Sequence, residues 1–200
     1  MKYEFTGEIK THSGVKLHQI RAVAAIALFS VSPGDIGGWI EKEENLSQSG
    51  NAWVYGDAQV YGNAQVYGDA QVYGDARVSG NAQVSGNAQV SGDAWVYGDA
   101  QVYGNAQVYG DARVYGNARV YGDAQVSPIF ISGIRWPITI ADSHMIIGCQ
   151  AHDLSRWWQF NDVQIARMDS EALEFWKLHK PYLQALCEAS GRLSGLEIET

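Results

Sequence analysis

The fold is decided by the stretch Asn51-Ala52-Trp53-Val54-Tyr55-Gly56 and by the twelve hexapeptides that follow it without a gap as far as Pro128. Each hexapeptide reads Asn or Asp, Ala, a variable residue, Val, Tyr or Ser, and Gly. Only the last one departs, with Pro128 in place of Gly. Repetition this strict at a short period is typical of a solenoid, in which each coil buries its apolar edge against the next coil.

The order of residues within one hexapeptide predicts a short strand followed by a corner. Ala58 and Val60 lie two residues apart, so they point to one side of a strand, whereas Gln59 and Tyr61 point to the other. Gly62 forms the corner, because glycine tolerates a positive φ. Three such units make a three-sided coil of eighteen residues, and thirteen make a little over four coils. At the usual strand spacing the stack is about 20 Å tall.

Residues eighteen positions apart should stack on each other along the axis of the coil. One inner ladder consists of Val54, Val72, Val90, Val108 and Val126. Methyl groups of Ala and Val fill the narrow interior, which leaves no room there for a ligand. A binding site must therefore lie outside the coil, at one of its ends or between subunits.

One corner of the coil should carry a row of carboxylates about 5 Å apart along the axis. The row consists of Asp57, Asp75, Asp93 and Asp111. Such a row could attract a cation, but a straight ladder presents diverging rather than converging ligands. We therefore favour the interpretation that these residues are solvated turn formers, and we expect no metal and no cofactor.

The side that follows this corner should carry Gln59, Arg77, Trp95 and Arg113, with tyrosines alongside. These neighbouring tyrosines are Tyr61, Tyr97 and Tyr115. Arg119 interrupts a ladder of glutamines on another side. Nine outward tyrosines in one solenoid predict an interface, since exposed aromatic patches mark interaction surfaces. Self-association is the simplest interpretation, and a pocket between subunits could also bind a planar or phosphorylated small molecule.

The flanking segments predict a cap and a helical extension. Residues 2–9 and 15–23 alternate polar and apolar side chains around a turn, which indicates a β-hairpin. Beyond Pro128 two apolar runs read as strands, and from Asp153 the apolar spacing becomes helical, with Pro181 expected to kink a helix or to start a new one. We divide the chain into residues 1–50, a β-hairpin and solenoid cap; 51–128, the repeat; 129–152, strands that close the solenoid; and 153–200, C-terminal helices.

The densest set of reactive side chains in the chain is His144, Cys149 and His152. Their short spacing suits metal ligands, and a Cys–His pair could form a reactive thiolate. No fourth ligand or third catalytic partner is visible. A cysteine at a strand end is more often a small buried hydrophobe, which is the interpretation we favour.

Charge and cysteine content exclude several classes of protein. A net charge of −8 argues against binding to a nucleic-acid backbone or to an anionic membrane. Two cysteines do not form a disulfide framework, and the apolar run 22–29 is too short to span a bilayer. We expect a soluble, cytoplasmic protein.

The repeat resembles the hexapeptide motif of left-handed parallel β-helices, which acyltransferases contain. The resemblance implies a left-handed coil and a trimer about an axis parallel to the coils. Those acyltransferases carry a catalytic His on or near the coils and a loop extruded from them, and the γ-class carbonic anhydrases carry three metal-binding His residues. This chain has no His between His18 and His144 and no insertion in the repeat, so the likeness is one of scaffold only.

The flanks resemble those of bacterial and prophage-encoded hexapeptide-repeat proteins. The motifs are Gly34-Asp35-Ile36-Gly37-Gly38-Trp39 and Glu44-Asn45-Leu46-Ser47 in the cap, and Ile147-Gly148-Cys149 and Phe175-Trp176-Lys177 in the tail. This resemblance covers nearly the whole chain and implies a phage or prophage origin, and hence the cytoplasm of a bacterial host, but it carries no activity.

These observations lead to one main hypothesis and two alternatives. The main hypothesis is a non-enzymatic oligomeric protein that engages a host macromolecule, or that sequesters a small nucleotide-like ligand at subunit interfaces, where Arg77, Arg113 and Arg119 would meet phosphates. One alternative is an acyltransferase-like enzyme with His144 or His152 as the base. The other is a structural scaffold or virion component.

Overall fold

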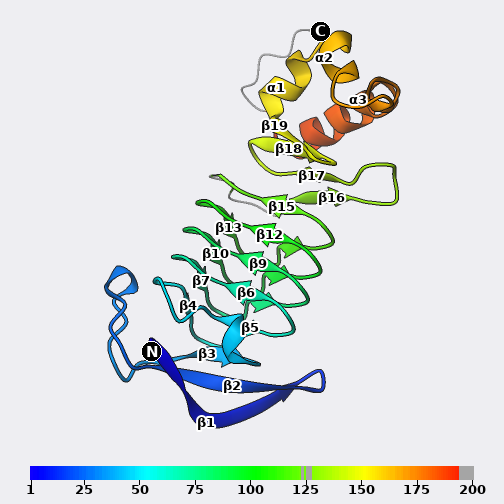
Figure 1. The fold of residues 1–200 in the computed structure, drawn as a ribbon. Coiled ribbons are helices and arrows are strands. Elements are labelled where there is room, and N and C mark those ends of the chain that lie inside the picture. The colour runs from blue at the N-terminus through cyan, green and yellow to red at the C-terminus, as the bar shows by residue number, and fades with distance from the viewer. Residues whose placement is uncertain (123, 125–127, 194–200) are drawn as a thin grey trace.

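The computed structural model describes residues 1–122, 124 and 128–193. The described chain forms an elongated molecule, with an N-terminal β cap at one end, a β-solenoid in the middle and a sheet with helices at the other end (Figure 1). The N-terminus lies at the cap, and the C-terminal helices lie at the opposite end of the stack (Figure 1).

The solenoid consists of two-residue strands, one in each hexapeptide. They are β4 (Trp53–Val54), β5 (Gln59–Val60), β6 (Gln65–Val66), β7 (Gln71–Val72), β8 (Arg77–Val78), β9 (Gln83–Val84), β10 (Gln89–Val90), β11 (Trp95–Val96), β12 (Gln101–Val102), β13 (Gln107–Val108), β14 (Arg113–Val114) and β15 (Arg119–Val120). Three parallel sheets form the three sides of the coil, with the orders β5-β8-β11-β14, β4-β7-β10-β13 and β6-β9-β12-β15. Paired residues are eighteen apart, as in Gln89 and Gln107, which confirms the predicted three-sided coil.

The interior and the corners of the coil follow from the repeat. The Ala and Val side chains of the described hexapeptides are buried and form one continuous core along the solenoid, whereas Val126 lies outside the described residues. The glycine before each corner has a positive φ, for example 68° at Gly80. The backbone N–H of Asn63 donates to the carbonyl of Gly80 at 2.8 Å, so adjacent corners are hydrogen-bonded along the axis.

The cap extends one side of the solenoid. β1 (Tyr3–His12) and β2 (Val15–Ala22) form an antiparallel hairpin, and β3 (Ile36–Ile40) pairs with β2 on one edge and with β5 on the other. Asn45 fastens the cap from within, because its side-chain amide donates to the carbonyls of Gly62 at 3.1 Å and Ala64 at 2.8 Å. The cap thereby covers the edge of the first coil, which would otherwise expose unpaired backbone groups.

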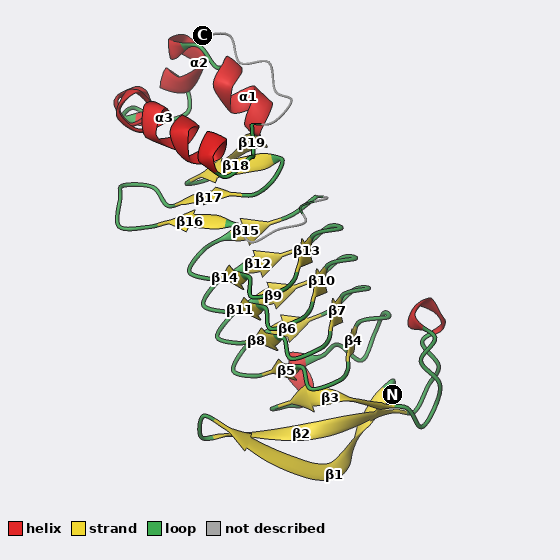
Figure 2. Ribbon diagram, turned by 180° about the vertical axis from the view of Figure 1, so that it is seen from behind, coloured by secondary structure: helices red, strands yellow, loops and turns green. Residues whose placement is uncertain are grey.

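A second small module follows the last coil. β16 (Ile129–Ile131), β17 (Ile138–Ile140), β18 (His144–Ile147) and β19 (Gln150–Asp153) form an antiparallel sheet. The helices α1 (Leu154–Gln159), α2 (Asp162–Ala166) and α3 (Ala172–Ala189) lie beyond this sheet, away from the solenoid (Figure 2). Sheet and helices share a core of their own, distinct from that of the coils. We call residues 129–193 the C-terminal module.

The longest helix of the described chain contains a proline. α3 runs through Pro181 without interruption, so the expectation that Pro181 starts a new helix is wrong. Among the described helices, none is long and apolar enough to cross a bilayer.

Candidate functional site

The sheet β5-β8-β11-β14 carries the predicted row of arginine and tryptophan. Arg77, Trp95 and Arg113 are paired in register on consecutive coils. The guanidinium carbon of Arg113 lies 6.0 Å from the centroid of the Trp95 ring, and the Trp95 indole N–H donates to Ser79 Oγ at 3.2 Å. The Trp95 ring is therefore anchored by Ser79 and lies near the guanidinium of Arg113, and it also packs against Tyr97 with ring centroids 4.6 Å apart.

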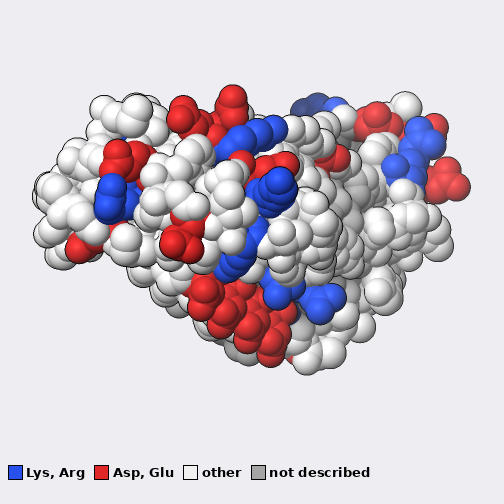
Figure 3. Space-filling view, turned by 90° about the horizontal axis from the view of Figure 1, so that it is seen from below, with Lys and Arg blue, Asp and Glu red and all other residues white. Residues whose placement is uncertain are grey.

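A row of carboxylates lies beside this row. The two rows line a groove of about 220 Å³. We call it the charged face; it consists of Asp75, Arg77, Asp93, Trp95, Asp111 and Arg113. A group of acidic side chains bordered by basic ones is visible on the surface (Figure 3). Within the described residues, no carboxylate of the charged face forms an ion pair with its arginines.

The cap supplies a lysine to the near end of the carboxylate row. Lys10 Nζ lies 3.7 Å from Asp57 and 4.3 Å from the centroid of Trp39. Burial lowers the pKa of Lys10, and the negative charge of Asp57 opposes that shift. Asp57 is thus partly neutralised by the cap, whereas the rest of the row faces solvent. No group of three or more His, Cys, Asp or Glu side chains among the described residues is placed to hold a metal ion.

The outward tyrosines lie against one another rather than standing free. Tyr97 stacks on Tyr115 with ring centroids 5.4 Å apart, and Tyr103 stacks on Tyr121 at 5.3 Å. Tyr61 packs against His12 of the cap at 5.9 Å. These contacts cover part of the aromatic surface within one chain, so less of it is bare than the sequence predicts. The most exposed tyrosines of the solenoid are Tyr67, Tyr103, Tyr109 and Tyr115.

Arg119 is not brought to the charged face. It lies on β15, in the sheet β6-β9-β12-β15, and lines a groove between the last coil and the C-terminal module. Within one chain the three arginines that were expected to meet phosphates therefore do not converge.

The three reactive side chains of the C-terminal module are also separated. His144 lies opposite Asp153 across the β18–β19 pair and His152 opposite Met145, so the two histidines are on opposite faces of the sheet. His144 faces the solenoid and stacks on Tyr121 at 3.9 Å, whereas His152 packs against Phe160 at 4.9 Å. Cys149 is an exposed free thiol in the turn between the strands. The arrangement provides neither a metal site nor a nucleophile–base pair.

Both histidines have a lowered pKa. Burial is the main cause that lowers the pKa of His144, against the opposing effect of Asp153. It also lowers the pKa of His152, and the positive charge of Arg156 acts in the same direction. Both side chains therefore favour the neutral form, and His144 is a buried packing residue at the junction of the two cores.

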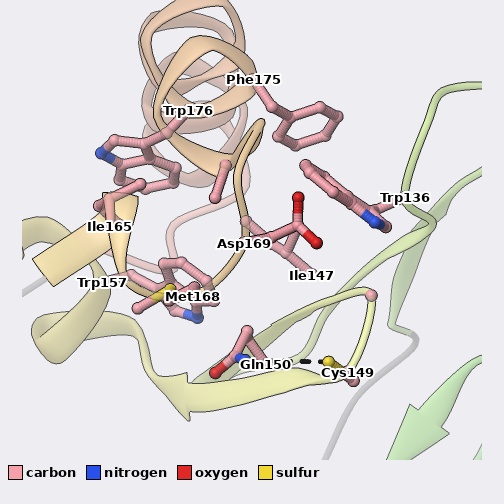
Figure 4. A pocket seen from close by; sticks show the side chains of 12 residues that line it. Trp136, Ile147, Cys149, Gln150, Trp157, Ile165, Met168, Asp169, Phe175 and Trp176 are labelled. Atoms are coloured by element: carbon pink, nitrogen blue, oxygen red, sulfur yellow. Dashed lines mark hydrogen bonds between the residues drawn. The ribbon is translucent and has the colours of Figure 1, made fainter.

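A site that the sequence did not indicate lies within the C-terminal module. A cavity of about 70 Å³ opens between the sheet and the helices (Figure 4). Its aromatic lining consists of Trp136, Trp157, Phe175 and Trp176. Asp169 and Cys149 lie at its exposed side. The lining residues are spread over three helices and several turns and strand ends, so their convergence is not visible in the sequence. The one sequence feature that could have suggested this site is the concentration of tryptophan after residue 135.

Comparison with known proteins bears on the solenoid alone. No curated protein matches the chain. A family model described as the YdcK beta solenoid repeat matches residues 58–71, 70–86, 82–98, 88–104, 100–114, 106–117 and 112–127. Residues 58–127 are thus similar to that repeat, and together with the stacked parallel sheets this match identifies the chain as a β-solenoid repeat protein.

Proposed function

We propose that this chain is a non-catalytic binding protein that assembles with copies of itself and docks a macromolecular partner on the charged face. The observation that carries the proposal is the pair of parallel rows of opposite charge, one along a corner of the solenoid and one on the adjoining sheet, which are not ion-paired with each other. A charge without a partner in its own chain is available to one in another molecule.

The composition of the charged face favours a protein partner over a phosphorylated small molecule. Three carboxylates and two guanidinium groups line the groove, so a phosphate there would meet more negative than positive charge. A protein surface with both signs of charge could pair with both rows. Arg and Trp are also the side chains that most often carry the binding energy of protein interfaces.

The exposed tyrosines support self-assembly on the other sides of the solenoid. Tyr103 and Tyr109 are 37% and 49% exposed on neighbouring sheets. Aromatic side chains are enriched at interfaces, and a trimer about an axis parallel to the coils would cover them. Resemblance of the flanks to prophage proteins and the free thiols of Cys149 and Cys187 support a reduced bacterial cytoplasm as the place of action.

An acyltransferase-like activity receives no support from the geometry, because His144 and His152 lie on opposite faces of their sheet. A purely structural rod needs no particular residue on the outer side of the coils. The row of Arg77, Trp95 and Arg113 therefore favours a binding role.

Native mass spectrometry of the gently purified protein tests this proposal. The wild type should appear as an oligomer that carries a partner protein in fixed ratio. The double variant Arg77→Gln/Arg113→Gln should keep the oligomer and lose at least about tenfold in partner binding, since charged interface pairs contribute 1.4 kcal/mol or more. The matched control, Arg156→Gln/Arg167→Gln, removes two charges far from the charged face and should bind as the wild type does. A bound phosphorylated small molecule, or a bare monomer, would refute the proposal.

A further inference from the structure

We propose that the cavity of the C-terminal module binds a methylated ammonium group, as a free quaternary amine or at the end of a side chain. This inference concerns a site away from the charged face and does not depend on the proposed function.

The walls of the cavity are aromatic and held in place by their own packing. The indole N–H of Trp157 donates to the carbonyl of Met145 at 2.6 Å in a buried hydrogen bond. Trp157 packs on Trp176 with centroids 5.3 Å apart, and Trp136 meets Phe175 edge to face at 4.9 Å. Rings fixed in this way need little reordering when a ligand enters.

Among the described residues that line the cavity, Asp169 is the single formally charged one (Figure 4). Its Oδ1 accepts from the backbone N–H of Glu171 at 3.0 Å and lies 3.5 Å from the hydroxyl of Ser170. Its Oδ2 has no partner among the described residues. A fixed carboxylate beside electron-rich ring faces attracts a cation and repels an anion.

Two rings of this cavity already hold cations from outside it. The guanidinium of Arg135 lies 5.0 Å from the centroid of Trp136, and Lys180 Nζ lies 5.8 Å from that of Trp176. Neither cation lines the cavity. Both rings therefore already take part in cation–π contacts, and neither of these cations occupies the cavity.

The few polar groups of the lining favour a methylated ammonium over a primary one. Gln150, Cys149 and Asp169 are its polar side chains. A primary ammonium carries three N–H donors and would leave donors unpaired against the rings, whereas methyl groups need only apolar contact. A volume of about 70 Å³ fits a compact head group rather than an extended molecule.

The inference can be tested by titrating the full chain with tetramethylammonium and with choline at constant ionic strength. Binding would be measured by calorimetry and by tryptophan fluorescence. We expect dissociation constants on the order of millimolar. The neutral isostere of choline, 3,3-dimethylbutan-1-ol, should bind at least about fivefold more weakly, because it lacks the cation–π attraction. A peptide containing trimethyllysine distinguishes a side-chain ligand from a free amine. Tighter binding of the peptide than of choline would indicate a side-chain ligand, and tighter binding of choline would indicate a free amine.

The variant Asp169→Asn provides the decisive control, because it retains the Oδ1 acceptor for Glu171 and removes the charge. It should weaken choline binding about three- to tenfold and leave the neutral alcohol unaffected. Glu174→Gln removes an exposed charge on α3 that does not line the cavity, and this variant should bind choline as the wild type does. Equal binding of choline and the alcohol, no binding of any cation, or an unchanged affinity in Asp169→Asn would overturn the inference.

Discussion

Replacement of a corner glycine should reveal how tightly the coils are stacked. Gly80 and Gly56 have the same backbone conformation, with φ of 68° and 67°. A Cβ on Gly80 would lie 2.9 Å from the backbone nitrogen of Gly98 and 3.0 Å from its carbonyl oxygen, which is closer than such atoms approach. A Cβ on Gly56 would lie 3.4 Å or more from Gly74, at ordinary contact distance.

The two substitutions share one cost and differ in another. A non-glycine residue in the left-handed region costs about 1–2 kcal/mol, and both Gly56→Ala and Gly80→Ala incur it. Gly80→Ala must also move the next corner by a few tenths of an ångström, against a hydrogen bond from Asn81 N–H to the carbonyl of Gly98 at 2.8 Å. Overpacking of this kind adds about 1–3 kcal/mol. We expect Gly80→Ala to lose roughly 2–5 kcal/mol and Gly56→Ala 1–2 kcal/mol.

Urea unfolding followed by circular dichroism measures the difference. Transition midpoints of the two variants should be compared directly, because a repeat protein can unfold in more than one step. Far-ultraviolet spectra must first show that both variants retain the wild-type β content. If Gly80→Ala is no less stable than Gly56→Ala within about 0.5 kcal/mol, the corners are not closely stacked and the reasoning fails.

Two further perturbations follow from single buried side chains. Asn45→Asp should destabilise the protein by about 2–3 kcal/mol, because a carboxylate would replace the amide that donates to the carbonyls of Gly62 and Ala64. A urea midpoint like that of the wild type would contradict this expectation. Burial holds the pKa of His144 below its ordinary value of 6.5, so the unfolded chain binds a proton first as the pH falls, and this residue's contribution to stability is lost below about pH 6.5. His144→Phe keeps an aromatic ring against Tyr121 but cannot bind a proton there. When the pH falls from 7.5 to 5.5, this variant should lose less stability than the wild type in the same assay. Equal losses would show that His144 is not the titrating group.

The architecture of the solenoid could be predicted because each of its positions has one physical role. The alternation of Ala58 and Val60 with Gln59 and Tyr61 fixes which side chains are buried, and Gly62 fixes the corner. Repetition then fixes the register, since every coil has the same length. The handedness of the coil could not be predicted from the periodicity, which is the same for either hand. The prediction of a left-handed coil rests on the resemblance alone.

The chemistry of the C-terminal module could not be predicted, because it depends on tertiary packing. His144, Cys149 and His152 are close in sequence, which suggested a site, but the alternation of side chains along β18 and β19 places the histidines on opposite faces. In contrast, Trp136 and Asp169 are far apart in sequence and line one cavity. Short spacing within a strand pair separates side chains as readily as it joins them.

The variable position of the hexapeptide shows where the solenoid departs from what its fold requires. Glutamine occupies most of these positions, so the coil is stable with Gln on any side. Trp53 departs for a structural reason, since it is buried against Tyr3 of the cap. Arg119 stands at the junction with the C-terminal module. The remaining departures, Arg77, Trp95 and Arg113, fall on consecutive coils of one sheet. Trp95 contacts Arg113, Ser79 and Tyr97, which all belong to this same side of the solenoid. Because the fold does not need them, this side of the rod is the one on which a partner should be sought.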